Sequence, residues 1–267
     1  MNRAISWTGL TRLLGYSPEY LADLGSRAPS MYHEVCQPKK SGGVRKLHVP
    51  ARELKEVQSR IAKILASHGL SNMAFAYRKG HCTAGALLPH KGQNYHFLVD
   101  IRDFFDSISA SRVFHCLVDL GFIPDVAQVL TSILTLNGRL PQGTPTSPVL
   151  SNLAARHLDT DLLTFAEVHG LAVSRYSDDM LFSSGRDFRK LTTAIVAILR
   201  RHGFRVKPKK TAYKIGPVET LGLRLLNNRL CLGTEILGRM RAAQPQKVRE
   251  GYLALLTMVR RLDSNAA

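Results

Sequence analysis

Apolar residues recur along the first part of the chain at spacings of three and four, which predicts helices. Short helices are expected within residues 6–34, where leucines dominate the pattern. A longer apolar stripe predicts a helix that Pro50 opens and that ends near Gly69. Two more helices are expected around residues 111–121 and 124–136.

Short apolar runs bounded by turn residues predict strands. Residues 39–50 are expected to form two short strands joined by a Gly-Gly turn, a hairpin that carries several cations. A strand is expected to end at Asp100, and a second hairpin is expected within residues 173–182. Two further strands are expected around residues 221–225 and 229–232.

A loop at residues 140–148 finishes in a helix start signal, with Ser147 as N-cap and Pro148 at the first helical position. One helix is expected from there to just before Gly170, another near residues 188–202, and a last one at the C-terminal end. This order of elements predicts an α+β fold: one antiparallel sheet with helices packed on one face.

Three aspartates stand where apolar strands end. Asp100 closes one apolar run, and Asp178 and Asp179 form a short acidic turn between two others. Carboxylates at the ends of buried strands are costly unless something compensates their charge. Together they predict a site that collects divalent cations. In the alternative, Asp178 and Asp179 merely make a polar turn and Asp100 caps the next helix.

The composition indicates which class of molecule the chain binds. The chain has 267 residues, 45% of them hydrophobic, which allows a substantial core divided into two or three lobes. It carries 37 Lys and Arg against 20 Asp and Glu, a formal net charge of +17. Such an excess is typical of proteins that bind nucleic acid, because neutralised phosphates release counterions. A solvated basic surface, or binding to acidic membranes or proteins, is the alternative.

The cysteines and the apolar runs of the sequence indicate the cellular compartment. The four cysteines are widely separated, which fits neither a zinc knuckle nor a disulfide framework, so reduced thiols are expected. The first residues lack the apolar stretch of a signal peptide, and no run approaches the length of a membrane span. A soluble, cytoplasmic protein without a membrane partner is therefore predicted.

Asp100, Asp178 and Asp179 are predicted to be the ligands of two Mg²⁺ ions, with Mn²⁺ as a possible substitute. Mg²⁺ prefers oxygen ligands, and a pair of these ions about 4 Å apart is what nucleotidyl transfer needs. In a strongly basic chain, such a site indicates a nucleotide polymerase. Crowded carboxylates repel one another without metal, so at least one pKa should be raised. Asp103 and Asp106 lie in the same turn as Asp100 and compete for its role. Asp100 is preferred because it ends the strand, whereas Asp103 is expected to cap a helix or present its amide to phosphate.

Six segments stand in the order of reverse transcriptase motifs, and the chain resembles bacterial reverse transcriptases over about residues 30–235. It resembles most the enzymes of retrons and related phage-defence systems. The specific parts are Pro-Gln-Gly…Ser-Pro-x-Leu-Ser-Asn and Tyr-x-Asp-Asp. The six segments are residues 39–50, 76–80, 100–108, 140–153, 176–179 and 221–223.

The resemblance implies a right-hand polymerase fold with fingers, palm and a short helical thumb. The implied domains are N-terminal helices (1–34), fingers (35–95), palm (96–220, with a fingers insertion at about 110–140), primer grip (221–234) and thumb (235–267).

The resemblance also implies residues that bind the incoming dNTP. Arg45, with Lys46, would bind the triphosphate, for which a guanidinium fork is suited; a solvated hairpin cation is the alternative for Arg45. Phe105 would lie beneath the sugar and exclude a 2′-hydroxyl, unless it is simply core. Gln142 would border the nucleotide. Lys210 would protonate or neutralise the leaving pyrophosphate, with plain backbone-phosphate binding as the alternative.

Five residues are implied to contact nucleic acid. Arg78 and Lys79 would follow the template strand, and Gly143 would border it, although loop geometry alone explains a glycine. Leu221 and Gly222 resemble the primer grip, although such leucines also suit a sheet core.

The chain departs from the retron pattern in places. Of Asn-Ala-x-x-His it keeps only His90, and where Val-Thr-Gly is usual it has Thr220-Leu221-Gly222. Asp106 replaces a usual proline without an evident reason. The chain ends about thirty residues beyond the last motif. A thumb that short predicts low processivity, or dependence on a bound structured RNA or partner protein.

The sequence as a whole is thus interpreted as an RNA-directed DNA polymerase that makes cDNA from a cognate RNA, in a retron-like antiphage system. Its expected partners are template RNA, the cDNA product, dNTPs, a cognate non-coding RNA and an effector protein. The alternatives are a catalytically idle RNA-binding or maturase-like scaffold, and a template-independent nucleotide polymerase. The oligomeric state is not predicted.

Overall fold

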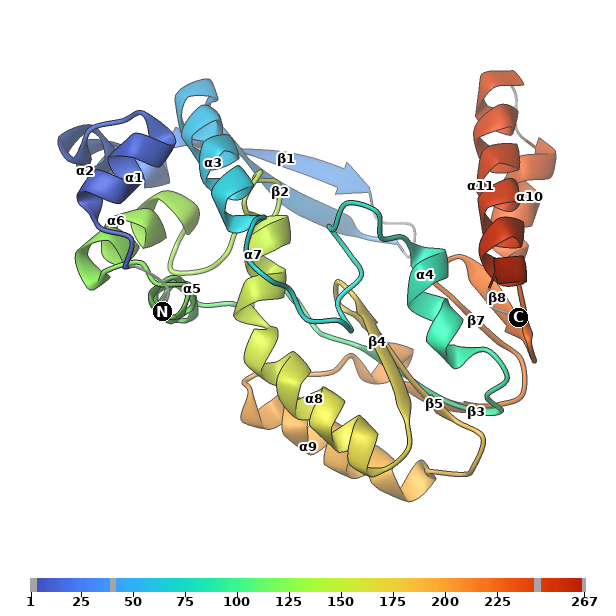
Figure 1. Ribbon diagram of the computed structural model, residues 1–267. Coiled ribbons are helices and arrows are strands. Elements are labelled where there is room, and N and C mark those ends of the chain that lie inside the picture. The colour runs from blue at the N-terminus through green and yellow to red at the C-terminus, as the bar shows by residue number, and fades with distance from the viewer. Residues whose placement is uncertain (1–3, 39–41, 243–245, 266–267) are drawn as a thin grey trace. The chain divides into compact units, whose positions relative to one another are not determined.

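The computed structural model describes residues 4–38, 42–242 and 246–265 (Figure 1). The chain divides into two compact units, each built from two separate stretches of sequence. The first unit comprises Met1–Leu70 and Asp103–Arg156, and the second comprises Ser71–Arg102 and His157–Ala267.

The first unit contains helices where its apolar spacing predicts them, together with one strand hairpin. Its helices bury leucine-rich faces: Leu21 and Leu24 of α2 and Leu54 of α3 are fully buried. The helices are α1 (Trp7–Leu14), α2 (Pro18–Arg27), α3 (Arg52–Leu65), α5 (Ala110–Asp119), α6 (Pro124–Leu134) and α7 (Ser147–Ala154), with a 3₁₀ turn at Ala28–Met31.

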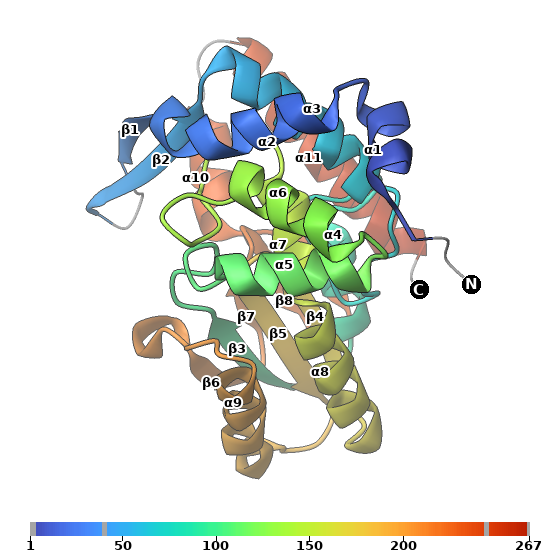
Figure 2. The same ribbon diagram turned by 90° about the vertical axis from the view of Figure 1, so that its left-hand side faces the viewer.

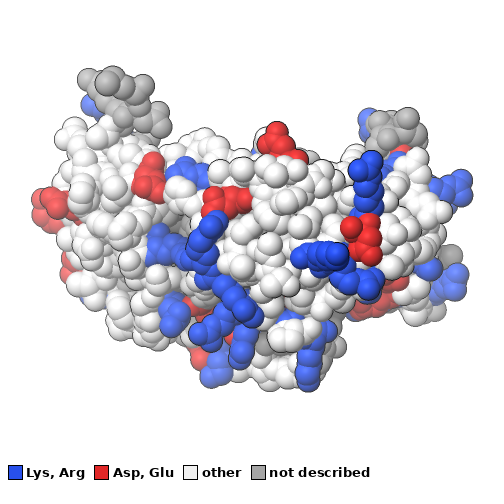
Figure 3. Space-filling view, turned by 90° about the horizontal axis from the view of Figure 1, so that it is seen from below, with Lys and Arg blue, Asp and Glu red and all other residues white. Residues whose placement is uncertain are grey.

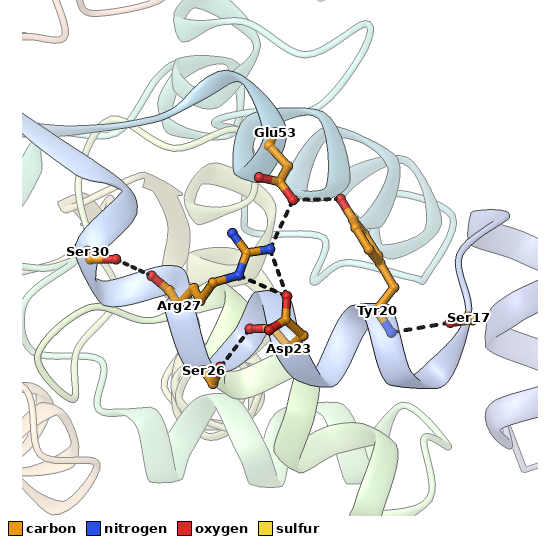
Figure 4. A network of polar contacts seen from close by, with 7 residues as sticks. All are labelled: Ser17, Tyr20, Asp23, Ser26, Arg27, Ser30 and Glu53. Carbon is orange, nitrogen blue, oxygen red and sulfur yellow. Dashed lines mark hydrogen bonds and ion pairs between the residues drawn. The ribbon is translucent and has the colours of Figure 1, made fainter.

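Polar contacts join α2 to α3 at the surface of this unit (Figure 4). Arg27 contacts Asp23 at 2.8 Å and Glu53 at 3.2 Å, and the Tyr20 hydroxyl donates to Glu53. These charged side chains are largely exposed, so the pairs add little stability. The buried apolar faces therefore hold the helices together.

The predicted cationic hairpin is present, but it begins earlier than expected. β1 (Tyr32–Pro38) pairs antiparallel with β2 (Val44–Pro50), with Tyr32 opposite Pro50 and Pro38 opposite Val44. The helical pattern expected to residue 34 therefore stops before Tyr32, and Pro50 ends a strand instead of opening a helix. Gly42 and Gly43 both have positive φ, as a turn requires. Residues 39–41 of the predicted hairpin lie outside the described residues.

The helix expected from Ser147 to just before Gly170 is interrupted. It consists of α7 and α8 (Arg156–Val168), separated by Ala155. Thr146, not Ser147, occupies the N-cap position, so Pro148 is the second helical residue and not the first, one position later than predicted. The Ser147 hydroxyl donates to the carbonyl of Pro141 at 2.5 Å, so it holds the preceding loop.

In its described residues, the second unit contains two antiparallel sheets. One has the strand order β4-β5-β3-β6 and the other has the order β7-β8-β9. Its strands are β3 (Tyr95–Asp100), β4 (Ala172–Tyr176), β5 (Asp179–Ser184), β6 (Ala212–Ile215), β7 (Val218–Thr220), β8 (Leu223–Leu226) and β9 (Arg229–Leu232). Its remaining elements are α4 (Thr83–Leu87), α8 from His157 onward, α9 (Thr192–Arg201), α10 (Thr234–Ala242), α11 (Gln246–Asn265) and 3₁₀ turns at Leu88–His90, Arg189–Leu191 and Pro208–Lys210.

The four-stranded sheet is covered on both faces, which corrects the expectation of one sheet with helices on one face. α8 and α9 lie along one face (Figures 1 and 2). On the other face Leu181 belongs to a core cluster with Ala84 and Leu87 of α4, residues of β7–β9 and Val259 of α11. Adjacent residues of a strand point to opposite faces, so β5 is apolar throughout its centre.

Among the described residues, no helix is both long and apolar enough to cross a lipid bilayer.

Candidate active site

The three aspartates lie together in the second unit because of strand register. Asp100, at the end of β3, is paired directly with Asp179, at the start of β5. The Ile101 amide donates to the Asp178 carbonyl at 2.8 Å and so extends the ladder to the turn. Side chains directly opposite in an antiparallel pair have Cβ atoms about 4.5–5.5 Å apart. The predicted proximity of these carboxylates is therefore built into the sheet.

The turn that carries Asp178 is strained. Tyr176 pairs with Asp179, which leaves Ser177 and Asp178 as a two-residue hairpin loop. Ser177 has a φ of 62°, where a type II′ turn normally has glycine. A non-glycine residue in this region costs about 1–2 kcal/mol, and such strain persists only where surrounding contacts impose it.

Two lysines compensate the charge of Asp100, which is almost completely buried. Lys207 Nζ lies 2.5 Å from Asp100 Oδ1 and 3.6 Å from Asp178 Oδ2, and Lys210 Nζ lies 2.8 Å from Asp100 Oδ2. The hydrogen bond to Asp100 raises the pKa of Lys210. The sequence suggested Lys210 but not Lys207. Residues three apart eclipse in a 3₁₀ turn, so the spacing across Pro208–Lys210 was the available signal.

The carboxyl of Asp179 has a raised pKa. Burial, followed by the charges of Asp178 and Asp100, raises the pKa of Asp179 to about 6. This is the direction expected for crowded carboxylates.

The donor set fits a hard divalent cation, since it offers several carboxylate oxygens. Asp100 Oδ1 is buried and accepts no hydrogen bond of regular geometry, although Lys207 lies beside it. Within the described ranges, however, no three His, Cys, Asp or Glu side chains converge on a metal position. The lysine ammonium groups take that place, so a cation would have to displace them from the carboxylates.

The helix-cap alternative for Asp100 and Asp103 does not hold. The helix that follows Asp100 is α5, and its N-cap is Ser109, whose hydroxyl accepts from the Arg112 amide. Neither Asp100 nor Asp103 therefore caps it. Asp103 instead takes a positive φ of 46° and its carbonyl accepts from the Ser107 amide at 2.8 Å.

The predicted dNTP-binding residues other than Lys210 belong to the first unit. Arg45 and Lys46 lie on β2 and are exposed, and Lys46 pairs with Glu34 at 3.1 Å. Phe104 is buried, whereas Phe105 is only half-buried, so the two are not equivalent core residues.

Gln142 and Gly143 are bound to β2. The Gln142 carbonyl accepts from the His48 amide at 2.7 Å. Gly143 has a φ of 106°, and a Cβ there would lie 3.0 Å from the His48 carbonyl oxygen. The close approach of loop and strand therefore requires glycine at this position.

The residues of the second unit that are predicted to contact nucleic acid differ in their exposure and hydrogen bonding. Arg78 donates to the carbonyls of Ser71 and Ala74, so its guanidinium holds its own loop, whereas Lys79 is exposed. Leu221 and Gly222 form the two-residue turn between β7 and β8, and both have positive φ.

The primer-grip turn is tightly packed. The Gly222 carbonyl accepts from the Gly233 amide, and a Cβ on Gly222 would lie 2.6 Å from Ile236. The buried leucine of the segment is Leu223, so half-buried Leu221 is not a core residue.

His90, the residue kept from the retron motif, braces β4 against β5. Its ring nitrogens lie 2.6 Å from the Ser183 hydroxyl and 2.9 Å from the Ser174 hydroxyl. Burial lowers the pKa of His90 to about 3, so it is neutral near pH 7. It therefore supports the hairpin that ends in the aspartates.

Sequence reasoning missed a second support, the buried pair of Arg175 and Asp159. Arg175 directly precedes the Tyr-x-Asp-Asp tetrad and is fully buried, as is Asp159 on α8. A basic residue within an apolar strand was the available signal, because arginine is almost never fully buried without a partner.

Comparison with known proteins identifies the family of the chain. The family described as reverse transcriptase (RNA-dependent DNA polymerase) matches residues 37–225. The chain belongs to the reverse transcriptase family. That match covers the aspartate pair, the strained turn and both lysines.

Relatives within the reverse transcriptase family include retron enzymes. The chain is 33% identical over 241 residues to the Retron Mx65 reverse transcriptase of Myxococcus xanthus, covering 82% of this chain and 56% of that protein. It is 31% identical over 206 residues to the Retron Ec86 reverse transcriptase of Escherichia coli, covering 74% of this chain and 64% of that protein. The chain thus spans somewhat under two thirds of the length of these relatives.

Solved structures show the same polymerase fold at low sequence identity. Telomerase from Candida albicans, in complex with a fragment of telomeric RNA, matches with a TM-score of 0.56 at 12% identity, over 76% of this chain and 46% of that one. The foamy viral protease–reverse transcriptase, in complex with double-stranded DNA, matches with a TM-score of 0.50 at 19% identity, over 89% and 38%.

Proposed function

We propose that this reverse transcriptase family member is an RNA-directed DNA polymerase, which extends a primer with dNTPs on an RNA template. The observation that carries the proposal is the register of β3 and β5, which sets Asp100 opposite Asp179 beside the turn with Asp178. A family match alone would also fit a catalytically idle scaffold, but a scaffold has no need of buried, mutually repelling carboxylates.

In this proposal Asp100, Asp178 and Asp179 hold two Mg²⁺ ions, or Mn²⁺ in their place. Bound there, the cations activate the primer 3′-hydroxyl and neutralise the triphosphate. Lys207 and Lys210 compensate the carboxylates when no cation is bound. Lys210, which contacts Asp100 Oδ2, would neutralise or protonate the leaving pyrophosphate. Catalysis of this kind depends mainly on positioning and charge neutralisation.

Arg45, Lys46 and Gln142 are proposed to bind the dNTP, with Arg45 as a bidentate partner of phosphate oxygens. Lys79 and Gly143 are proposed to contact the template strand, and Leu221 and Gly222 the primer. Arg78 is proposed to act on the template through the loop that its guanidinium holds.

Template dependence tests the proposal directly. The purified chain should extend a DNA primer on an RNA template with Mg²⁺ and dNTPs, and the product sequence should be the complement of the RNA. Reactions without template, and with ribonucleotides alone, serve as controls. Products with the same sequence whether or not RNA is present would replace this proposal with template-independent addition. No incorporation under any condition would favour an idle scaffold.

Phe105 is proposed to select deoxynucleotides through contact with the sugar. Its ring is half-buried, whereas its neighbour Phe104 is core, so Phe105→Ala should leave the fold intact. We expect the variant to accept ribonucleotides about 10–100-fold better relative to dNTPs, as for removal of a steric block worth a few kcal/mol. Single-nucleotide incorporation kinetics measure this ratio. Discrimination equal to that of the wild type would contradict the role.

Similarity to retron reverse transcriptases supports a biological role in which the chain copies part of a cognate non-coding RNA, acting with an effector protein in phage defence. Sequencing the nucleic acid that copurifies from the native host tests this. A defined cDNA joined to, or paired with, one structured RNA is expected. Random cellular RNA without cDNA would contradict it.

A further inference from the structure

Arg175 makes directed contacts to two different elements of the second unit. Its Nε donates to Asp159 Oδ1 at 2.8 Å and its Nη2 donates to Asp159 Oδ2 at 2.6 Å. This is the bidentate pairing that a guanidinium fork makes with a carboxylate. Both side chains have no exposed surface, so the pair ties α8 rigidly to β4.

The third contact of Arg175 reaches the candidate site. Its Nη1 donates to the carbonyl of Ser177 at 3.2 Å. Ser177 is the strained residue of the loop, and Asp178 and Asp179 follow it directly. The peptide group that Arg175 binds is therefore the one that leads into Asp178.

A second segment supports the same hairpin from its other edge. The Arg175 amide donates to the Met73 carbonyl at 2.6 Å, and the Phe75 amide donates to the Arg175 carbonyl at 2.9 Å. The hydroxyls of Tyr77 and Ser177 lie 3.0 Å apart. Ser177 is thus contacted by Arg175, which Asp159 holds in turn, and by Tyr77, which lies 100 positions away in sequence.

Stability alone does not account for a buried pair of this kind. Desolvation of two charges offsets most of their attraction, and apolar replacements of similar volume are often neutral or stabilising. Burial accordingly raises the pKa of Asp159, against the opposing effect of Arg175. What an apolar pair cannot supply is a donor to the Ser177 carbonyl.

We propose that Arg175, anchored by Asp159, is a positioning residue that fixes the Ser177 peptide and thereby the orientation of the Asp178 and Asp179 carboxylates. The inference rests on the proposed function of these carboxylates as cation ligands. The alternative is an ordinary structural pair that only joins α8 to the sheet.

The double variant Arg175→Met/Asp159→Leu separates these two roles, since it removes both charges and keeps most of the volume. We expect it to fold, with a Tm close to that of the wild type. We expect its affinity for Mn²⁺, measured by electron paramagnetic resonance without nucleic acid, to fall by about tenfold or more. Primer extension should lose about 100-fold in kcat with little change in the Kd for primer–template, as expected when catalytic groups are misplaced.

Arg175→Lys provides the conservative comparison. A lysine keeps the positive charge beside Asp159 but cannot bind it bidentately while also reaching Ser177. We expect Arg175→Lys to fold and to show a Mn²⁺ affinity between those of the wild type and the double variant. If the double variant does not fold, the Mn²⁺ affinity of folded Arg175→Lys decides: a decrease supports the proposal, and a wild-type value overturns it.

Lys91→Met is the matched control, because Lys91 pairs with Asp263 at 2.9 Å and is itself largely buried in the same unit. That pair joins the segment before β3 to α11, and Asp100 stands at the opposite end of β3. The control should lower Tm without changing Mn²⁺ affinity.

A folded double variant with wild-type Mn²⁺ affinity and kcat would overturn the positioning role. The outcome is distinguishable from a failure of the proposed function. Wild-type protein that binds Mn²⁺ but incorporates no dNTP would contradict the proposed polymerase function. The positioning role would then be decided by the Mn²⁺ affinities of the variants alone. Wild-type protein that binds no Mn²⁺ would overturn both.

Discussion

At the scale of single residues, the candidate site depends on how buried charge is compensated. Asp100 is buried, and Lys207 and Lys210 compensate the negative charge of its carboxylate. These lysines act on Asp179 only as nearby charges, and burial and the other two carboxylates drive it toward its neutral form. The three proposed cation ligands thus differ in their environments, although all three are aspartates.

The raised pKa of Asp179 predicts a pH dependence of stability. Its folded-state pKa of about 6 lies above the usual 3.8, so the folded state binds the proton more tightly than the unfolded chain. This contribution is fully present below about pH 4 and is lost as pH rises through 6. In the absence of metal, the unfolding free energy of the wild type should fall by about 1–3 kcal/mol more than that of Asp179→Asn as the pH rises through this window.

Urea unfolding in EDTA at pH 4.5 and pH 7 measures the effect, and Asp161→Asn is a control because Asp161 is an exposed aspartate whose pKa is lowered by hydrogen bonding to His202. An equal loss of stability in wild type and Asp179→Asn between the two pH values would contradict the assignment.

At the scale of elements, the apolar patterning predicted strands and helices well where they bury a face. The strands at Arg229–Leu232 and Tyr95–Asp100 and the helix α6 were expected close to their true positions. The boundaries that failed depend on contacts invisible in local sequence. β1 extends back to Tyr32 because β2 pairs with it, and Ser147 is drawn to the Pro141 carbonyl instead of capping α7.

The loop before α7 gives a prediction at this scale. Gly143→Ala places a methyl group 3.0 Å from the His48 carbonyl oxygen at a φ of 106°. We expect it to destabilise the first unit by about 2–4 kcal/mol, from strain at a special backbone position together with a steric clash. Denaturant unfolding provides the measurement.

Gly121→Ala is its control, because Gly121 has a φ of 97° and a methyl group added there would meet no described atom within 4 Å. That substitution should cost only the backbone strain, about 1–2 kcal/mol. Equal losses at the two positions would show that the approach of the loop to β2 does not matter.

At the scale of the whole molecule, the sequence predicted the family better than the architecture. A linear motif order is enough to indicate Asp100, Asp178 and Asp179. The division of the strands among separate antiparallel sheets, and a core cluster around Leu181 on the second face of one of them, arise from long-range packing that no local pattern encodes. The same holds for Arg175, whose partner Asp159 lies on a different element.

The charge of the molecule is distributed rather than confined to the site. The net charge of +17 comes from Lys and Arg side chains that are spread over the surface with Asp and Glu between them, as one face shows (Figure 3). A distributed basic surface suits the phosphate backbone of a nucleic acid and gives binding that weakens as salt rises. Attraction of this kind does not depend on base sequence, so it would not by itself distinguish one nucleic acid from another.

The central claim is that the aspartates of β3 and of the β4–β5 turn together hold the cations that drive nucleotidyl transfer. RNA-templated dNTP incorporation by Asp100→Asn, Asp178→Asn and Asp179→Asn tests it most directly, with Mg²⁺ titrated and Asp161→Asn as control. Each of the three variants should fold, yet lose at least about 1,000-fold in kcat at saturating Mg²⁺, whereas Asp161→Asn retains wild-type activity. Wild-type incorporation by a folded variant of any of the three aspartates would contradict the account.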